Sequence, residues 1–181
     1  MENLKVAHDG TVRDASNRVV QFLYGDDGVD AVHIVRLPIP PLCEPWDLDD
    51  YSIDFKVLMA LREERERAVD ALAYLQEWSK EHQETLVSCP VDVAVLYERA
   101  RMLSGPKVQH ESLERILEAV QELLDVVDIH LFKQFLSLFL QTKNLIKLNT
   151  TFFQWFVETV QERFERSKIQ AGEMVGVSSY Y

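Results

Sequence analysis

Residues 113–127 read LERILEAVQELLDVV, and this stretch decides the fold class. Its apolar side chains recur at the three-, four- and seven-residue spacing of a single helical face, with polar residues between them. The members of this face are Leu113, Ile116, Leu117, Val120, Leu123, Leu124 and Val127. The spacing predicts an amphipathic helix that packs one side against a core.

Four more helices are predicted around it, which gives a mostly α fold: a bundle of about five helices. A long helix begins near the N-cap residue Ser52, and a second follows Pro90 and ends at about Leu103. Residues 131–148 are apolar nearly all round, so this helix is expected at the centre. The last begins at Thr151, with Gln154 completing a capping box, and ends at 171–172. The first helix is expected to bury Phe55, Leu58, Met59, Leu61, Val69, Leu72, Ala73 and Leu75.

The residues before the bundle have a different character. Residues 11–13 and 18–24 are rich in β-branched and aromatic residues and flank a turn-forming stretch, which predicts a small β-hairpin. Four prolines between Pro38 and Pro45 predict an irregular connector that Trp46 anchors to the domain. The expected divisions are a β-rich lead-in at 1–30, a connector at 31–50, a helical domain at 51–177 and a tail at 178–181.

The charge balance limits the partners of this chain. It has 181 residues with 30 acidic and 19 basic side chains, a formal charge of −11. Such a surface repels phosphates, so neither DNA nor RNA is expected to bind it directly, and basic or neutral proteins are the expected partners. Cys43 and Cys89 stand far apart and are interpreted as reduced thiols of an intracellular protein. No apolar run is long enough to predict a membrane span or a signal peptide.

Residues that could carry out chemistry are few. Asp26, Asp27 and Asp30 lie in a glycine-containing loop and could bind a divalent cation. A calcium loop of the EF-hand type needs Glu at its twelfth position, which counted from Asp26 is Leu37. A turn with exposed acids is therefore favoured over a metal-dependent enzyme. The histidines are scattered, and no catalytic or metal-binding residue is predicted.

Two segments match a known family. Residues 9–34 resemble the segment that follows the bridge helix in the largest subunit of RNA polymerase II, and residues 153–177 resemble the approach to its trigger loop. The matching positions are Gln21, Phe22, Tyr24, Gly25, Asp27, Gly28, Asp30, His33, Gly172, Glu173, Met174 and Gly176. The continuation Ala31-Val32-His33-Ile34 resembles polymerase II rather than polymerases I or III.

The resemblance implies the foot region of that subunit, which is helical and braces the segment between bridge helix and trigger loop. It implies a nuclear, non-catalytic module whose partners are other polymerase II subunits and transcription or RNA-processing factors. The Mg²⁺ of the parent enzyme would be bound elsewhere, because the family's aspartate loop has no counterpart here. Ser178-Ser179-Tyr180-Tyr181 departs from the family and is interpreted as an artificial extension.

Docking is predicted on acidic side chains of the connector and the first helix, although a plain solvated face is the favoured interpretation of the same residues. These residues are Asp47, Asp49, Asp50, Glu63, Glu64 and Glu66. A stand-alone acidic interaction module derived from a polymerase subunit is the alternative function.

Overall fold

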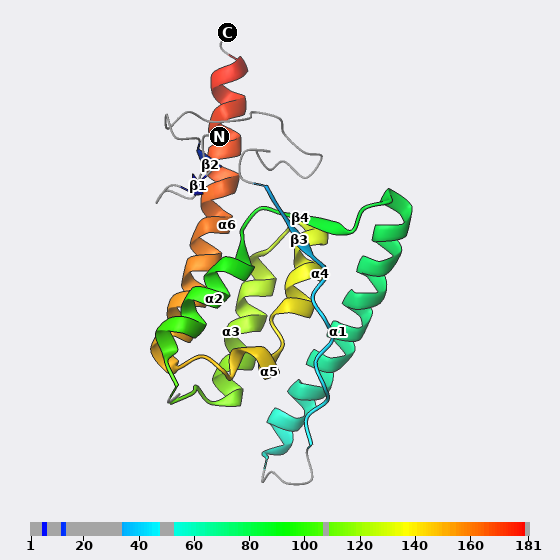
Figure 1. Ribbon diagram of the computed structural model, residues 1–181, viewed down its shortest axis with the longest axis vertical. Helices are drawn as coiled ribbons and strands as arrows, with labels where there is room; N and C mark the ends of the chain where they lie inside the picture. Colours follow the sequence, from blue (N-terminus) through cyan, green and yellow to red (C-terminus); the bar gives the residue numbers. More distant parts are fainter. Residues whose placement is uncertain (1–4, 7–11, 14–33, 48–52, 107–108, 180–181) are drawn as a thin grey trace.

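The computed structural model confirms a mostly α fold with a small β-hairpin near its start (Figure 1). It describes residues 5–6, 12–13, 34–47, 53–106 and 109–179, with side chains from 34 to 168 within these ranges. The helices are α1 (Phe55–His82), α2 (Val93–Ser104), α3 (Leu113–Val126), α4 (His130–Phe139), α5 (Thr142–Leu145) and α6 (Thr150–Ser179). The strands are β1 (Lys5–Val6), β2 (Val12–Arg13), β3 (Val35–Pro38) and β4 (Leu86–Cys89).

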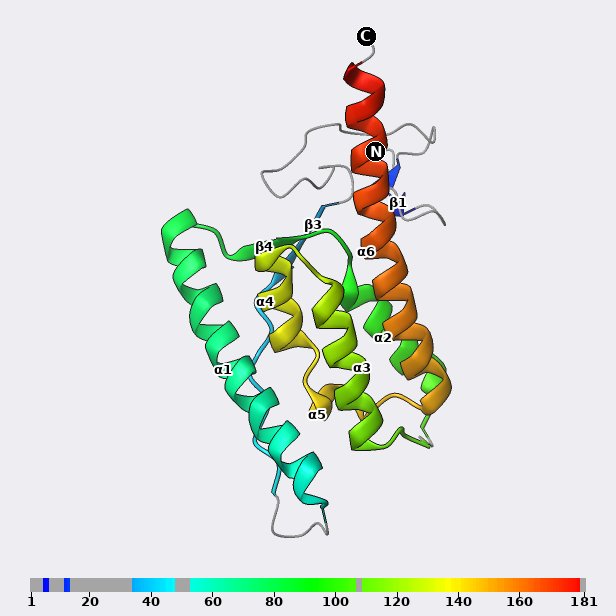
Figure 2. The same ribbon diagram turned by 180° about the vertical axis from the view of Figure 1, so that it is seen from behind.

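The core lies between α3, α4 and α6. Six of the seven residues of the predicted α3 face are buried, and Leu113 at its edge is half-buried. Phenylalanines of α4 and α6 meet there, with the rings of Phe132 and Phe164 stacked 5.7 Å apart. Burying such a side chain contributes roughly 1.5–3 kcal/mol, so these contacts stabilise the packing of the helices against one another. Figures 1 and 2 show α6 beside α2 on one side of this core and α1 beside α4 on the other.

The buried face of α1 differs from the predicted one. Leu61, Glu64, Ala68, Ala71 and Leu75 are its buried residues and follow a regular helical spacing. Phe55, Met59 and Val69, which were predicted to be core, are exposed, with Phe55 at 71%. The prediction was wrong because it selected large apolar residues, whereas close packing of α1 on α4 uses two alanines and accommodates a glutamate.

Four predicted helix boundaries also need correction. The N-cap of α1 is Asp54, whose Oδ1 accepts from Lys56 N at 3.3 Å, and Ser52 lies outside the described residues. The predicted central helix is interrupted after Phe139, so α4 and α5 are separate helices. Asn149 rather than Thr151 caps α6, its Oδ1 accepting from Phe152 N at 2.8 Å. The α6 backbone continues to Ser179, past the predicted end at 171–172.

The connector contains a strand that the sequence analysis missed. β3 pairs antiparallel with β4, with Arg36 opposite Ser88 and Pro38 opposite Leu86. Proline is tolerated at such a position because this two-stranded ladder has open edges. The pairing fixes the start of the connector against the helical body.

The lead-in is described only in part. β1 pairs antiparallel with β2, with Lys5 opposite Arg13. The hairpin was predicted to join 11–13 to 18–24, and the second of these segments lies outside the described residues. The domain divisions at 30, 50 and 177 stay predictions. Among the described residues, none of the helices combines the length and apolarity needed to cross a bilayer.

Candidate interaction surfaces

Glu64 of α1 is buried, which removes it from the predicted docking surface. Only 7% of the residue is exposed, and its Oε1 accepts from both the backbone N and the Oγ1 of Thr142, each at 3.0 Å. Burial raises the pKa of Glu64, and the two hydrogen bonds from Thr142 oppose the shift. This carboxyl group joins α1 to α5 and is largely covered by the protein.

Hydrogen bonds hold the connector next to the buried contact between Glu64 and Thr142. Gln141 accepts from Cys43 N at 3.1 Å through its Oε1 and donates through its Nε2 to the carbonyl of Pro41, also at 3.1 Å. Trp46 Nε1 donates to Thr142 Oγ1 at 2.9 Å, which confirms Trp46 as the anchor of the connector. Arg65 of α1 donates to the carbonyl oxygen of Cys43. Residues about 100 positions apart in sequence are thereby held in one polar network.

Four cationic side chains surround the same place. A pocket of about 120 Å³ is lined by connector residues 43–46 and by Arg62, Arg65 and Lys143. The Lys143 Nζ lies 4.5 Å from the centroid of the Trp46 ring, a cation–π contact. Lys147, Lys143 and Arg65 all lower the pKa of the Cys43 thiol, but burial outweighs them and the net shift is upward. We call Arg62, Arg65, Lys143 and Lys147 the cationic cluster.

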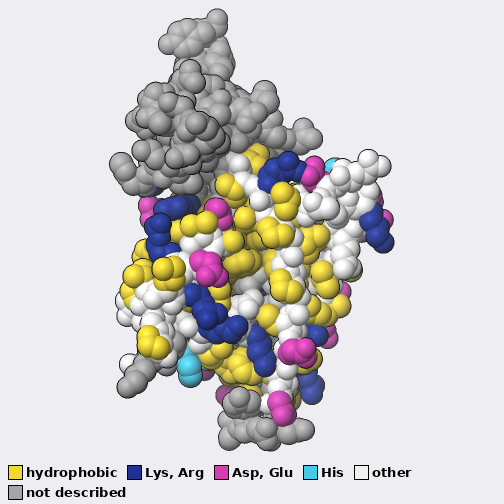
Figure 3. Space-filling model, viewed as in Figure 1, with side chains coloured by type: hydrophobic (Ala, Val, Ile, Leu, Met, Phe, Trp, Pro, Cys, Tyr) yellow, Lys and Arg dark blue, Asp and Glu magenta, His cyan; other side chains and the backbone are white. Residues whose placement is uncertain are grey.

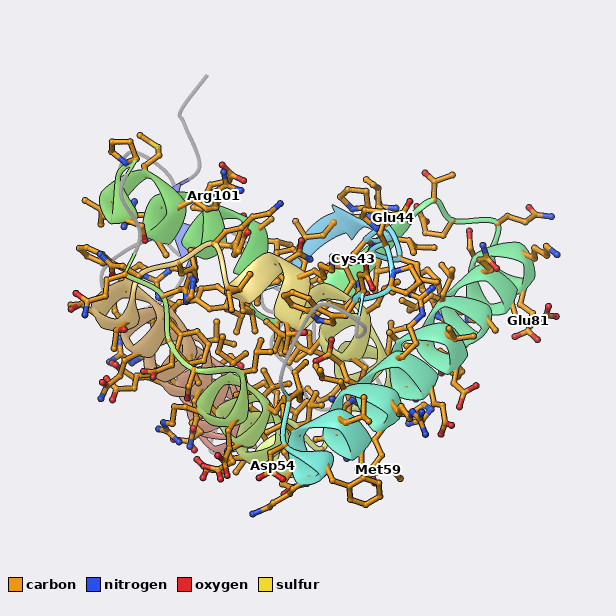
Figure 4. All side chains as sticks on the ribbon, turned by 90° about the horizontal axis from the view of Figure 1, so that it is seen from below. Cys43, Glu44, Asp54, Met59, Glu81 and Arg101 are labelled. Atoms are coloured by element: carbon orange, nitrogen blue, oxygen red, sulfur yellow. The ribbon has the colours of Figure 1, made fainter. Side chains whose placement is uncertain are left out.

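The face that carries the connector is shown in Figure 3. Lys and Arg side chains gather near its middle, among hydrophobic side chains. Figure 4 shows Cys43 and Glu44 on the connector beside α1, with Arg101 on α2 farther along. A cationic region therefore exists on a chain whose net charge is −11.

A second hollow lies between α1 and α3 and has the opposite character. It measures about 190 Å³, and acidic side chains dominate its rim: Glu63, Glu114 and Glu118 stand against Lys56. The other residues that line it are Val57, Ala60, Arg67, Leu117 and Gln121. We call it the acidic groove.

Arg67 lies under this groove. Its Nη1 donates to Gln121 Oε1 at 3.2 Å, while its buried Nε finds no acceptor within the described part of the chain. Burial lowers the pKa of Arg67, and Glu64, Glu63 and Asp125 oppose the shift. The charge of Arg67 is thus partly offset by acidic side chains, among them the buried Glu64 and the exposed rim residue Glu63.

The structure separates the predicted docking residues. Asp47, Glu63 and Glu66 are exposed, Glu64 is buried, and Asp49 and Asp50 lie outside the described residues. Glu63 faces the acidic groove, whereas Asp47 follows Trp46 on the connector, so the two lie on different surfaces. Among the described members, Glu63 and Asp47 therefore do not form one docking patch, and docking on these acids stays a prediction.

Most of the residues that carry the family resemblance lie outside the part of the chain that the structure describes. Gln21, Phe22, Tyr24, Gly25, Asp27, Gly28, Asp30 and His33 lie outside the described residues, as does Asp26. Gly172, Glu173, Met174 and Gly176 lie on the backbone of α6. The described residues contain no group of three or more His, Cys, Asp or Glu side chains placed to hold a metal ion.

The sequence analysis did not find the cationic cluster or Gln141 and Thr142. Arg62 and Arg65 were not singled out, and Lys143 and Lys147 were interpreted as part of a central helix. A weak signal was present, because polar residues 141–144 interrupt an otherwise apolar segment. Only contact between the connector, α1 and α5 shows what that interruption does.

The sequence is similar to subunits of DNA-directed RNA polymerases. It is 25% identical over 186 residues to DNA-directed RNA polymerase III subunit rpc1 of Schizosaccharomyces pombe, an alignment that covers 97% of this chain and 12% of that subunit. Two DNA-directed RNA polymerase II subunits of Trypanosoma brucei brucei, RPB1-A and RPB1-B, are 35% identical over 60 residues, 32% of this chain and 3% of each subunit. Its relatives are largest subunits of RNA polymerases.

An archaeal relative supports the same conclusion. DNA-directed RNA polymerase subunit Rpo1N of Thermococcus celer is 57% identical over 30 residues, 17% of this chain and 3% of that subunit. No protein-family model matches the chain. The chain spans about an eighth or less of the length of these relatives. The resemblance to polymerase largest subunits is confirmed, while the polymerase II class and the foot region stay predictions.

Proposed function

We propose that the chain is a non-catalytic structural and factor-docking module of the RNA polymerase II largest subunit, in the region called the foot. It would act in the nucleus in DNA-dependent mRNA transcription, bound to other polymerase subunits. The observation that carries the proposal is the similarity to a polymerase subunit across 97% of the chain. Under this proposal the chain binds no nucleic acid and holds no cofactor, and the Mg²⁺ of the enzyme is bound elsewhere.

The physical properties of the described body suit a brace. The buried phenylalanines of α4 and α6 and the network around Gln141 and Thr142 fix the helices and the connector relative to one another. A body with a dense apolar core and a fastened connector transmits force without large internal rearrangement. Exposed acidic and cationic regions on its surface provide places where partners could dock.

The assignment to polymerase II rests on residues 31–34, whose pattern resembles that class. The relative aligned along most of the chain is a polymerase III subunit, so the class needs a direct test. An affinity tag placed at residue 1 in the source organism would allow purification and mass spectrometry of the bound subunits.

The expected result is recovery of the complete polymerase II subunit set. Recovery of subunits found only in polymerase III would move the module to that enzyme and overturn the polymerase II assignment. Recovery of no polymerase subunit would overturn the proposal and favour a stand-alone interaction module. Cross-linking before purification would identify which subunit surfaces lie against α1 and the connector.

A further inference from the structure

We propose that the pocket between connector residues 43–46, α1 and α5 binds a phosphorylated serine or threonine side chain of a partner protein. This inference deepens the docking part of the proposed function and rests on it. It names both the place and the chemistry of a partner that the net charge of the chain would not suggest.

The first support is the arrangement of the cationic cluster. Arg62, Arg65 and Lys143 line one small pocket, and Lys147 lies close enough to act on the Cys43 thiol beside it. Two come from one face of α1 and two from α5 and the residues after it, so they converge from different elements. Within the described part of the chain, no ion pair joins any of these four side chains to an acid.

The second support is that the pocket is held in shape. Arg65 donates one hydrogen bond to the Cys43 carbonyl, and an arginine side chain has five N–H donors, so others remain for a ligand. Lys143 is positioned over the Trp46 ring, and Trp46 is fixed by its bond to Thr142. Pre-positioned side chains lose less conformational entropy on binding than free ones.

The third support is the match between ligand charge and pocket. A phosphate monoester carries about −1.5 to −2 charges near neutral pH and offers three acceptor oxygens, which arginine and lysine recognise well. Two acids share the pocket: Glu44 is exposed at its rim, and Glu64 is buried and already occupied by Thr142.

The size of the pocket favours a single phosphorylated side chain over a nucleic acid strand. A volume of about 120 Å³ accommodates one such group. A nucleic acid would continue past the pocket over a chain that has eleven more acidic than basic residues. A phosphopeptide bound by an arginine cluster places only one phosphate group in the pocket and does not need a basic surface around it.

The test uses the full 181-residue chain and a fluorescein-labelled peptide with one phosphoserine among alanine and glycine residues. The same peptide with serine, the same peptide with glutamate, and a short single-stranded RNA serve as competing probes. Fluorescence anisotropy measures the affinities, and amide chemical shifts locate the contact. We expect the phosphopeptide to bind at least about tenfold more tightly than the serine peptide, with shifts at 43–46, 62–65 and 143–147.

Variants then assign the binding to the cluster. Arg62→Ala combined with Lys147→Ala removes two exposed cations that have no described structural bond, and should weaken phosphopeptide binding about tenfold. Arg115→Ala combined with Lys80→Ala removes the same charge from exposed positions of α3 and α1, and should change binding less than about twofold. Urea unfolding of each variant shows whether the fold is retained.

Several outcomes would overturn the inference. These are equal binding of phosphorylated and unphosphorylated peptides, equal losses in both double variants, or tighter binding of the RNA at the same shifts.

Affinity purification of the Arg62→Ala, Lys147→Ala double variant separates the phosphate site from the proposed function. If the variant loses phosphopeptide binding and the polymerase subunits are still recovered, the result supports both the phosphate site and the proposed function. Absence of phosphopeptide binding in the unaltered chain, with the subunits recovered, removes only the phosphate site.

Discussion

The acidic groove and the cationic pocket both border α1, yet they use its charges in opposite ways. Glu63 faces the groove and is exposed, whereas the next residue, Glu64, is buried beneath the pocket. Successive residues on a helix point about 100° apart, so adjacent glutamates reach different environments. A charged run in the sequence therefore does not define one surface, because the packing of the helix buries some of its residues and exposes others.

The two regions also differ in how their polar groups are held. In the groove, the Lys56 and Glu114 side chains are 79% and 54% exposed, and their charged atoms lie 3.9 Å apart. At the pocket, Thr142 and Gln141 are buried and hydrogen-bonded to Glu64 and to the connector. Exposed ion pairs contribute little to stability, whereas breaking a buried hydrogen-bonded contact is costly. Substitutions should therefore separate the two regions clearly.

The largest effect is expected for Glu64→Ala. This change leaves the Thr142 backbone N–H and hydroxyl without their acceptor and opens a cavity, which should lower the free energy of unfolding by about 3 kcal/mol. Urea unfolding followed by circular dichroism measures it. Glu63→Ala is the matched control, with an expected change below about 0.5 kcal/mol. Similar losses in both variants would show that the two regions do not differ as described.

A smaller loss is expected for Trp46→Ala. It removes the hydrogen bond to Thr142 Oγ1, the cation–π contact with Lys143 and the packing of the half-buried ring. Together these contribute about 2 kcal/mol. Trp46→Phe keeps an aromatic ring and loses the N–H donor, so its cost should be nearer 1 kcal/mol. Hydrogen exchange should rise at Cys43 N in the alanine variant, and unchanged protection there would argue against Trp46 as the anchor.

The pH dependence of Glu64→Gln sharpens the same contrast. Because the folded-state pKa of Glu64 is raised, the neutral form is favoured in the folded protein, and stability is lost as pH rises from the ordinary glutamate value through the folded-state value. Glutamine does not titrate. The stability of the unaltered protein relative to this variant should therefore fall as the pH rises from the ordinary glutamate value, about 4.3, through the raised folded-state value.

Urea unfolding of both proteins at a series of pH values measures this difference. Contributions from other titrating groups are common to both proteins and cancel. Glu63→Gln, at an exposed position beside the groove, is the matched variant for comparison. A constant difference for Glu64→Gln would show that burial does not disfavour the charge of Glu64.

The smallest effect is expected for Lys56→Ala at the rim of the acidic groove. The exposed contact with Glu114 should contribute less than about 0.5 kcal/mol. Thermal unfolding at low and high salt tests this expectation. A loss above about 1 kcal/mol would mean that the groove is held together electrostatically and resembles the pocket more than its exposure indicates.

Part of the fold was predictable because local periodicity carries it. The α3 face at 113–127 was predicted correctly, since its apolar residues follow the helical repeat without interruption. The end of α2 was also predictable, because Gly105 adopts a positive φ of 73° that a glycine readily accepts. The family resemblance correctly indicated a similarity to polymerase largest subunits, which the described side chains alone would not have done.

The remaining features depend on contacts between distant segments. β3 ends at the first proline of the connector, Pro38, and becomes a strand because residues 86–89 offer it a partner. The chain breaks between α4 and α5 without glycine or proline, where Gln141 turns its amide toward Leu138 and Pro41. Glu64 was predicted to be exposed because charged residues usually are, and its burial depends on Thr142, 78 positions away.

The sequence by itself determined the helical class, the net acidity and the kinship to polymerase subunits, because composition, periodicity and motif order are properties of the chain alone. The tertiary structure decided where the charges act. It brought Arg62 and Arg65 to Lys143 and Lys147 around the connector, and it buried Glu64 between them and the core. The physical reason is that electrostatic interactions depend on distance and burial in space, which the order of residues does not specify.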